Sequence, residues 1–495
     1  MHNYDLVIIG GGINGVGIAA DAAGRGLRVA LFEQADLAGA TSSASTKLVH
    51  GGLRYLETYQ FSLVRKALKE SQLLLELAPH LIEPISIILP YERKLRPWLL
   101  LRAGLFIYNH LASRPSYPPA AALRISSNSP LHESVIRGIS FADGQVDDAR
   151  LVILNACQAR NFGADIFTYH RCVNLEAGKD CWNLRVCNLA NGSERQFTAR
   201  AVVNASGPWV SRFVREATGA APKRQVRMVR GSHILVPSTY EGPQAYMLQN
   251  ADGRIAFVIP YQGQFSMIGT TEAEFDGDPT GVEISEQEID YLLDIHNRYF
   301  VRRIARQDIV YSWSGVRPLI DDRQTTATRT SRNYQLVFED FSLPLLSVYG
   351  GKLTTYRLLA EQAVDKLSDT FDGMPASNTA RVKLPGGEFG SREELTKDLT
   401  GRYPWLPEVI VSRWVTAYGS LAFKLLSDCD GVSALGKNFG HGLTQREVDY
   451  LVAREWARSA DDILWRRTKL GLLFDSAQRD ELETYIAKLQ GPIDP

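Results

Sequence analysis

The stretch YDLVIIGGGINGVGIAADAAGRGLRVALFE, residues 4–33, decides the fold of this chain. Its first part, YDLVIIG, is typical of a buried strand, INGVGIAADAAGRG of a helix, and LRVALFE of a second buried strand. Three glycines in the pattern G-x-G-x-x-G, namely Gly10, Gly12 and Gly15, lie at the turn from the first strand into the helix. The three elements together predict a βαβ unit with a glycine-rich turn.

The glycine-rich turn predicts a site for the pyrophosphate of a dinucleotide. Gly10 permits the tight turn, Gly12 lets the backbone approach the pyrophosphate, and Gly15 lets the helix pack on the strand. The N-terminus of this helix, at Ile13 and Asn14, attracts phosphate charge. A glycine turn that joins strand to helix without any ligand is the alternative, and the strand and helix around it argue against that.

Glu33 ends the second strand, where an acid of this motif takes the ribose hydroxyls of adenosine. The motif alone does not separate FAD from NAD, but two later segments favour FAD. AVVNASGPW (201–209) is a strand that ends in a small-residue turn at Gly207, and SVYGGKLTTYR (347–357) offers a second helix N-terminus after Gly351. A helix N-terminus near the flavin pyrimidine stabilises the negative charge that reduction puts there.

Length and composition indicate a globular protein of two or three domains, because the chain has 495 residues, of which 45% are hydrophobic. Its 55 Lys and Arg balance its 55 Asp and Glu, so overall charge gives no argument for a nucleic-acid partner. The five cysteines form no CxxC pair and no metal-ligand spacing with histidines, which argues against a disulfide framework or a metal site. A reducing, cytoplasmic compartment fits this cysteine usage.

No secretory signal is expected, because MHNYDLVIIGGG leads straight into the first strand. The most apolar window, LRPWLLLRAGLFIYNHL (95–111), is interrupted by Arg102 and is too short for a spanning helix of about twenty apolar residues. RKLRPWLLLRAGLFIY (93–108) combines basic residues, Trp98 and an apolar face, as a helix lying in a membrane surface does. A buried helix with snorkelling arginines is the alternative.

The order of elements predicts domains that are discontinuous in sequence. Strands are expected in FTYHRCVNLE, CWNLRVCNLA and RQFTARAVVNASG (167–207), the last two joined by a tight turn at Asn191–Gly192. SHILVPS (232–238) and RIAFVIPYQGQFSMIGTT (254–271) indicate a separate antiparallel sheet, and the pattern beyond residue 385, as in 443–471, is mostly helical. The expected units are an FAD-binding domain (1–80, 145–215 and 340–384), a substrate or cap domain (81–144 and 216–339) and a helical C-terminal domain (385–495).

Segments along essentially the whole chain carry a resemblance to a known family. They are IIGGGINGVGIAADAAGRGL (8–27), ATSSASTKLVHGGLRYLE (40–57), GPWV (207–210), IGTTE (268–272), SGVRPL (314–319), GGKLTTYR (350–357) and ADDILWRRTKLGL (460–472). In these segments the chain resembles the aerobic, quinone-linked type of FAD-dependent glycerol-3-phosphate dehydrogenase. The resemblance implies an α/β fold with a Rossmann-like FAD domain of the D-amino-acid-oxidase type, an antiparallel-sheet substrate domain and a small helical C-terminal domain.

The resemblance also implies a reaction and a place in the cell. The reaction is oxidation of sn-glycerol 3-phosphate to dihydroxyacetone phosphate, with FAD as cofactor and ubiquinone or menaquinone as electron acceptor. The implied location is the cytoplasmic side of the cell membrane, with the enzyme peripheral on its inner face. Whether the protein is a monomer or a homodimer stays open.

A substrate phosphate needs cationic side chains, and planar arginine forks with a lysine are suited to hold a phosphomonoester. The resemblance places Arg317 and Arg332 at the phosphate. Any one of these arginines could instead be an ordinary surface charge. The expected substrate-binding set is Arg54, Tyr55, Thr270, Arg317, Arg332 and Lys352.

Oxidation of a secondary alcohol by flavin needs a base for the hydroxyl proton. His50 in VHGG and His233 in RGSHILV are the candidates, and with Arg317 they form the expected catalytic set. His233 is the preferred base, with His50 beside the flavin. Either histidine could instead serve only to orient the flavin or the sheet.

The hydroxyl-rich segment TSSASTK (41–47) is expected to contact the cofactor. Its serines could alternatively cap the next helix, and Lys47 could be a solvated side chain. With these residues, the expected cofactor-binding set is Gly10, Gly12, Ile13, Asn14, Gly15, Glu33, Ser42, Ser43, Lys47, Gly207, Gly351, Lys352, Leu353 and Thr354.

Three rival functions stay open at this point. A glycerol-3-phosphate oxidase carries out the same half-reaction with dioxygen as acceptor. A binding protein could hold FAD as a structural group without oxidising any alcohol. An amine or amino-acid oxidase would bind a carboxylate rather than a phosphate, and the clustered basic candidates argue against it.

Overall fold

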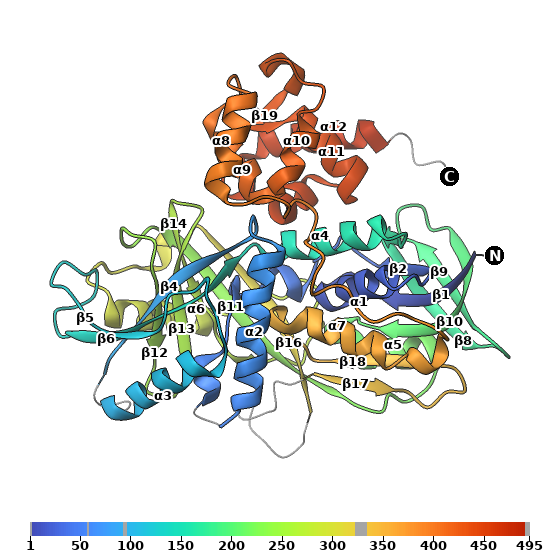
Figure 1. Ribbon diagram of the computed structural model, residues 1–495, viewed down its shortest axis with the longest axis horizontal. Coiled ribbons are helices and arrows are strands. Elements are labelled where there is room, and N and C mark those ends of the chain that lie inside the picture. The colour runs from blue at the N-terminus through green and yellow to red at the C-terminus, as the bar shows by residue number, and fades with distance from the viewer. Residues whose placement is uncertain (1, 57–58, 93–96, 322–333, 491–495) are drawn as a thin grey trace.

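The structure is a computed structural model, which describes residues 2–56, 59–92, 97–321 and 334–490. Figure 1 shows two large sheets side by side and a group of helices, formed by the end of the chain, that sits above them. One sheet has eight strands and the other has ten. This arrangement of mixed sheets and a helical C-terminal region agrees with the fold expected from the sequence.

The eight-stranded sheet is built around parallel strands that end at one edge. Ile9 pairs with Asn204, which in turn pairs with Ser347 of a third parallel strand. The strand order is β17 (Gln335–Phe338), β18 (Leu345–Tyr349), β10 (Glu194–Asn204), β1 (His2–Ile9), β2 (Val29–Glu33) and β7 (Asp165–Thr168). In addition, β9 (Trp182–Asn188) pairs with β10, and β8 (His170–Ala177) pairs with β9.

Both faces of the first strand are covered, which explains its continuous apolar run. Leu6 and Ile8 pack against helices on one face, and Val7 packs with Trp182 of the β8–β9 meander on the other. The helices on the first face are α1 (Ile13–Gly24), α4 (Asp148–Asn161) and α7 (Tyr356–Asp365), while α5 (Val210–Thr218) follows β10.

The ten-stranded sheet is mainly antiparallel and carries helix α6 (Glu286–Tyr299) on one face. Helices α2 (Phe61–Leu77) and α3 (Trp98–Leu111) lie in the same part of the molecule (Figure 1). The strand order is β15 (Ala273–Glu274), β11 (Val226–Pro237), β14 (Phe265–Gly269), β13 (Ile255–Tyr261), β12 (Ala245–Gln249), β4 (Ile82–Pro90), β6 (Arg137–Val146) and β3 (Leu48–Val49), with β16 (Tyr311–Ile320) on β11 and β5 (Ala121–Arg124) on β6.

The C-terminal helices enclose a core of their own, in which Trp414, Leu399 and Leu482 are buried. Their elements are α8 (Arg392–Arg402), α9 (Glu408–Tyr418), α10 (Ala422–Leu425), β19 (Asn438–Gly440), β20 (Leu443–Thr444), α11 (Gln445–Glu455), a π-helix (Asp462–Arg467) and α12 (Ser476–Gln490).

The run 443–471 is mostly helical, as expected, and its first helix, α11, ends where Trp456 takes a left-handed conformation, with φ of 56°. One segment differs from the sequence-based expectation. The run 167–176 is two strands rather than one, because Tyr169 between them has φ of 58°. The hairpin at Asn191–Gly192 is confirmed, since β9 and β10 pair antiparallel across it.

Helix α3 exposes large apolar side chains, which a buried helix would not do. Leu99, Leu100 and Phe106 are 77%, 61% and 65% exposed. The buried-helix alternative is therefore wrong for the described part of segment 93–108, of which residues 93–96 lie outside the described ranges. Among the helices described, none has the length and apolar character needed to cross a membrane.

A buried ion pair joins the helical domain to helix α4, which packs on the eight-stranded sheet. Arg150 of α4 and Glu455 of α11 have fully buried side chains, and their second contact, from Nη2 to Oε1, measures 3.1 Å. Arg150 also donates from Nη2 to the carbonyl of Ala417 over 2.9 Å. A charge taken out of water in this way needs its partner, so the contact fixes how the two parts meet.

We expect Arg150→Met to lower the free energy of unfolding by about 3 to 5 kcal/mol, because it leaves the Glu455 carboxylate buried without its partner. Urea denaturation followed by tryptophan fluorescence measures this change. The double variant Arg150→Met/Glu455→Met removes both charges and should regain most of the loss. A single variant as stable as the parent protein would show that the pair does not hold the domains together.

Candidate cofactor and substrate site

A cavity of about 1400 Å³ lies where the two sheets and the helical domain meet. Its wall combines the turns that follow β1, β2, β10 and β18 with strands β11 and β16 of the second sheet. The helical domain contributes Trp465, Arg466 and Lys469 to the same wall. Segments far apart in sequence therefore build one site.

The glycine-rich turn is packed too closely for side chains. Gly10 has φ of 112°, and a Cβ there would lie 2.6 Å from the carbonyl oxygen of Ala205. A Cβ on Gly15 would lie 1.9 Å from the carbonyl oxygen of Gly10. Gly10 and Gly12 line the cavity, as do Ile13 and Asn14, whereas Gly15 packs behind them.

Glu33 organises the turn that follows the second strand. One carboxylate oxygen accepts the Gly11 amide at 2.6 Å, and the other accepts the Ala35 amide at 2.8 Å. Burial raises the pKa of Glu33, and the two backbone hydrogen bonds oppose that shift. Glu33 also lines the cavity, so its contact with a ribose stays a prediction that its position allows.

The serine-rich segment caps a helix, but not the next one in the chain. Ser42 Oγ accepts the amide of Ile13 at 3.0 Å, at the N-terminus of α1. Ser43 Oγ donates to the Ala40 carbonyl over 3.3 Å, and both serines line the cavity. The local-cap alternative is therefore wrong for Ser42, and its partner could not be found from sequence spacing.

Lys47 is not a solvated side chain. Its Nζ lies 2.9 and 3.0 Å from the two carboxylate oxygens of Asp148, and only 7% of its side chain is exposed. It also lies 5.4 Å from the centroid of the Trp313 ring, a cation–π contact. Burial lowers the pKa of Lys47, and the negative charge of Asp148 opposes this shift. Lys47 lines the cavity, and its contact with the cofactor stays a prediction.

The turn after β18 meets the glycine-rich turn. Asn14 Nδ2 donates to the Gly350 carbonyl over 3.3 Å, and Thr354 Oγ1 accepts the His50 amide at 3.1 Å. The cavity wall from these turns includes Gly207, Gly351, Lys352, Leu353 and Thr354, all expected as cofactor contacts.

These features fit a long dinucleotide such as FAD. The turns after β1, β10 and β18 reach the same edge, and each carries a glycine with positive φ, at Gly10, Gly207 and Gly351. Asn14 Oδ1 is buried and finds no donor among the described residues. A bound dinucleotide would meet backbone amides at the α1 N-terminus and the carboxylate of Glu33 at the end of β2.

The predicted phosphate-binding residues meet on the second sheet. Arg317 Nη2 donates to Thr270 Oγ1 over 2.9 Å, and both residues line the cavity. Gly231 leaves room for them, because a Cβ there would lie 2.6 Å from Arg317 Nη2. Arg332 and the side chains of Arg54 and Tyr55 lie outside the described residues.

The two histidines occupy different positions. His50 lines the cavity. His233 is fully buried, lies 3.0 Å from Thr46 Oγ1 through Nε2, and stacks on Trp313 with ring centroids 5.1 Å apart. Burial, with the nearby charges of Arg317 and Lys47, lowers the pKa of His233 well below its ordinary value, so its imidazole is neutral. Which histidine acts as the base stays a prediction.

Two acids that sequence reasoning missed support the cavity wall. Asp148 holds Lys47, and Asp143 accepts the Gly51 amide at 3.2 Å and the Tyr108 hydroxyl at 2.9 Å. Burial raises the pKa of Asp143 to about 6. Both acids stand in FADGQVDDAR (141–150), and their role was hidden because their partners come from other parts of the chain.

Asp143 gives a stability prediction with a defined sign. Its pKa rises from 3.8 in the unfolded chain to about 6 in the folded one, so the folded state binds more protons between these values. The contribution of this group to stability is therefore lost as pH rises through that window. As pH rises from 5 to 7.5, the free energy of unfolding of Asp143→Asn should increase by about 1 kcal/mol relative to that of the parent protein.

Urea denaturation at the two pH values measures this change, and Asp290→Asn on the surface serves as a control. A difference between Asp143→Asn and the parent that does not vary with pH would contradict the raised pKa.

Comparison with known proteins shows the family. Residues 5–357 match the family described as FAD dependent oxidoreductase, and residues 377–491 match the C-terminal domain of alpha-glycerophosphate oxidase. A glycerol-3-phosphate dehydrogenase of Pseudomonas aeruginosa is 49% identical over 98% of this chain and 95% of the relative. A D-erythritol 1-phosphate dehydrogenase of Brucella abortus is 43% identical over 96% of each chain.

A solved structure supports the same conclusion. The glycerol-3-phosphate dehydrogenase of Bacillus halodurans, complexed with FAD, superimposes with a TM-score of 0.75 at 25% identity, over 98% of this chain and 94% of that one. The fold, the glycine-rich turn and these matches agree. The chain belongs to the family of FAD-dependent glycerol-3-phosphate dehydrogenases, and FAD is its cofactor.

Proposed function

We propose that this protein oxidises sn-glycerol 3-phosphate to dihydroxyacetone phosphate and passes the electrons to ubiquinone or menaquinone. The observation that carries the proposal is the Arg317–Thr270 pair in the wall of the FAD cavity. An arginine fork held in place beside the cofactor is suited to a phosphate dianion. The relatives named for phosphorylated polyols support the same substrate class.

The remaining substrate contacts are proposed from the family resemblance. Lys352 lines the cavity and adds a second cation, while Arg54, Tyr55 and Arg332 are proposed as further phosphate-side contacts. The scarcity of acids in segment 41–56 agrees with two anionic ligands, because a carboxylate beside a phosphate would repel it.

Bound FAD supplies the hydride acceptor, so the protein itself must remove the hydroxyl proton. We propose His50 as the group that takes this proton, because it lines the cavity whereas His233 lies behind Trp313 and Thr46. His233 then acts as a neutral support for Thr46. This proposal departs from the sequence-based preference for His233 because a base must first reach its proton.

A membrane quinone requires contact with the bilayer. Helix α3 exposes Leu99, Leu100 and Phe106 beside the basic Arg102, and side chains of this kind enter a membrane surface. We propose that the enzyme binds peripherally to the inner face of the cell membrane through this helix.

Replacing Arg317 tests the phosphate site. We expect Arg317→Ala to raise the Michaelis constant for glycerol 3-phosphate about tenfold to hundredfold, because a hydrogen bond to a charged group contributes about 1.5 to 3 kcal/mol. FAD should stay bound, as its absorbance will show. Arg254→Ala, at the β12–β13 hairpin, is the matched control and should behave like the parent enzyme. Unchanged kinetics in Arg317→Ala would remove Arg317 from the phosphate site.

The acceptor is tested by reoxidation in a stopped-flow instrument. Once glycerol 3-phosphate has reduced the enzyme, we expect a soluble quinone analogue to reoxidise it much faster than air-saturated buffer does. Rapid reoxidation by air, unmatched by the quinone, would favour the oxidase instead.

D-erythritol 1-phosphate is a second candidate substrate, because the Brucella abortus relative covers nearly the whole chain. Steady-state kinetics with both substrates decide between them. A higher kcat/KM for glycerol 3-phosphate supports the proposal, and a higher value for D-erythritol 1-phosphate would replace it.

A further inference from the structure

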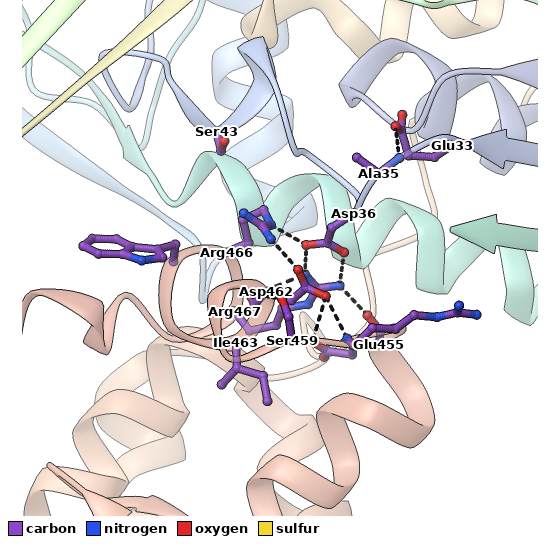
Figure 2. Close-up of polar contacts among 12 residues, drawn as sticks. Glu33, Ala35, Asp36, Ser43, Glu455, Ser459, Asp462, Ile463, Arg466 and Arg467 are labelled. Atoms are coloured by element: carbon purple, nitrogen blue, oxygen red, sulfur yellow. Dashed lines mark hydrogen bonds and ion pairs between the residues drawn. The ribbon is translucent and has the colours of Figure 1, made fainter. Parts of the chain in front are cut away.

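The helical C-terminal domain contacts the cofactor half of the molecule through a buried charge cluster (Figure 2). Asp36, which follows β2, is 2% exposed, and Arg467 of the π-helix is fully buried. Arg467 Nη2 donates to Asp36 Oδ1 over 2.8 Å. The other carboxylate oxygen, Oδ2, accepts from both Arg467 Nη1 and Arg466 Nε. One carboxylate thus receives two guanidinium groups from the other domain.

The arginines are held firmly on their own side. Arg467 Nη2 also donates to the Glu455 carbonyl over 2.6 Å. Asp462 pairs with Arg466 and accepts the Arg458 amide at 2.7 Å. The cluster therefore rests on the end of α11 and on the first residue of the π-helix.

On the cofactor side, Asp36 lies between Glu33 and the hydroxyl-rich segment 41–47. Its own carbonyl accepts the Gly39 amide at 3.0 Å, and the Ala38 amide donates to the Gly11 carbonyl over 3.1 Å. Residues 33–35 and 39–43 line the cavity, while the Asp36 side chain reaches the helical domain. The segment that joins Glu33 to Ser42 and Ser43 is thus also held by the helical domain, through Asp36.

Other contacts hold this segment on the cofactor side, since the Ala35 carbonyl accepts the Tyr169 amide at 3.1 Å and Thr41 Oγ1 donates to the Val316 carbonyl over 2.7 Å. Within residues 34–40, Leu37 and Ala38 are buried and the remaining residues apart from Asp36 are exposed. The π-helix that supplies both arginines also places Trp465 and Arg466 in the cavity wall. A displacement of the helical domain would therefore alter the wall and remove the buried ion pairs of Asp36 at the same time.

We propose that the C-terminal domain is a clamp for FAD. Asp36, Arg466 and Arg467 are positioning residues, which hold segment 34–43 in the conformation that receives the cofactor. The domain acts through cofactor affinity rather than through the chemical step. This inference rests on the identity of the cofactor and is independent of the electron acceptor and of the substrate.

The test measures FAD affinity in the full-length protein. Apoprotein of Arg467→Met is titrated with FAD, and the quenching of flavin fluorescence gives the dissociation constant. We expect it to rise at least tenfold, while kcat and KM at saturating FAD stay within about threefold of the parent values.

Arg413→Met is the matched control, because Arg413 binds Glu447 and the Gly442 carbonyl in the same way, but entirely inside the helical domain. It should lower the melting temperature to a similar extent and leave the FAD dissociation constant within about twofold of the parent. Equal loss of FAD affinity in both variants would show that the cluster only stabilises the fold, and this would overturn the proposal. Unchanged FAD affinity in Arg467→Met would overturn it as well.

A second variant keeps the test decisive if Arg467→Met fails to fold. Arg467→Lys keeps the charge but loses the planar fork that reaches both Asp36 oxygens and the Glu455 carbonyl. Its FAD dissociation constant should rise by about threefold or more at a near-parental melting temperature. Parental affinity in Arg467→Lys would contradict the clamp.

Discussion

The parallel pairing of β1, β10 and β18 is the constraint on which the rest of the structure depends. Since Ile9, Asn204 and Ser347 lie in register, the turns that follow these strands reach one edge of the sheet. Ligands of open α/β sheets bind at the carboxyl ends of the strands for this reason. The chain can leave the sheet between these strands to build a second sheet and still return to the same site.

Burial of charge explains how the other parts are attached to that edge. Asp36, Arg150 and Lys47 are each taken out of water against a partner from another segment. Each pair costs desolvation energy and fixes a geometry, because a displaced partner would leave an uncompensated charge in the interior. Two of these pairs hold parts of the cavity wall, because Lys47 lines the cavity and Asp36 lies between residues that line it.

The sequence predicted what depends on local patterns and missed what depends on distant partners. Gly10 and Gly12 could be assigned to a pyrophosphate and Glu33 to a ribose, because their spacing along one βαβ unit fixes their geometry. Lys47 and Ser42 could not be assigned partners, because Asp148 and the Ile13 amide approach them only through tertiary packing. Arg317 and Thr270 were assigned to the substrate by family resemblance, and in the structure their side chains form a hydrogen bond. Sequence spacing did not indicate the Asp36 cluster, because Arg466 and Arg467 lie 430 and 431 residues after Asp36 in the chain.

We expect a polyol phosphate in this cavity to reduce the bound FAD. The most direct measurement is the visible spectrum of the purified holoenzyme under anaerobic conditions, before and after one equivalent of glycerol 3-phosphate. We expect loss of the oxidised flavin absorbance with glycerol 3-phosphate and no change with glycerol, which lacks the phosphate. A flavin that stays oxidised with glycerol 3-phosphate would contradict the proposed function.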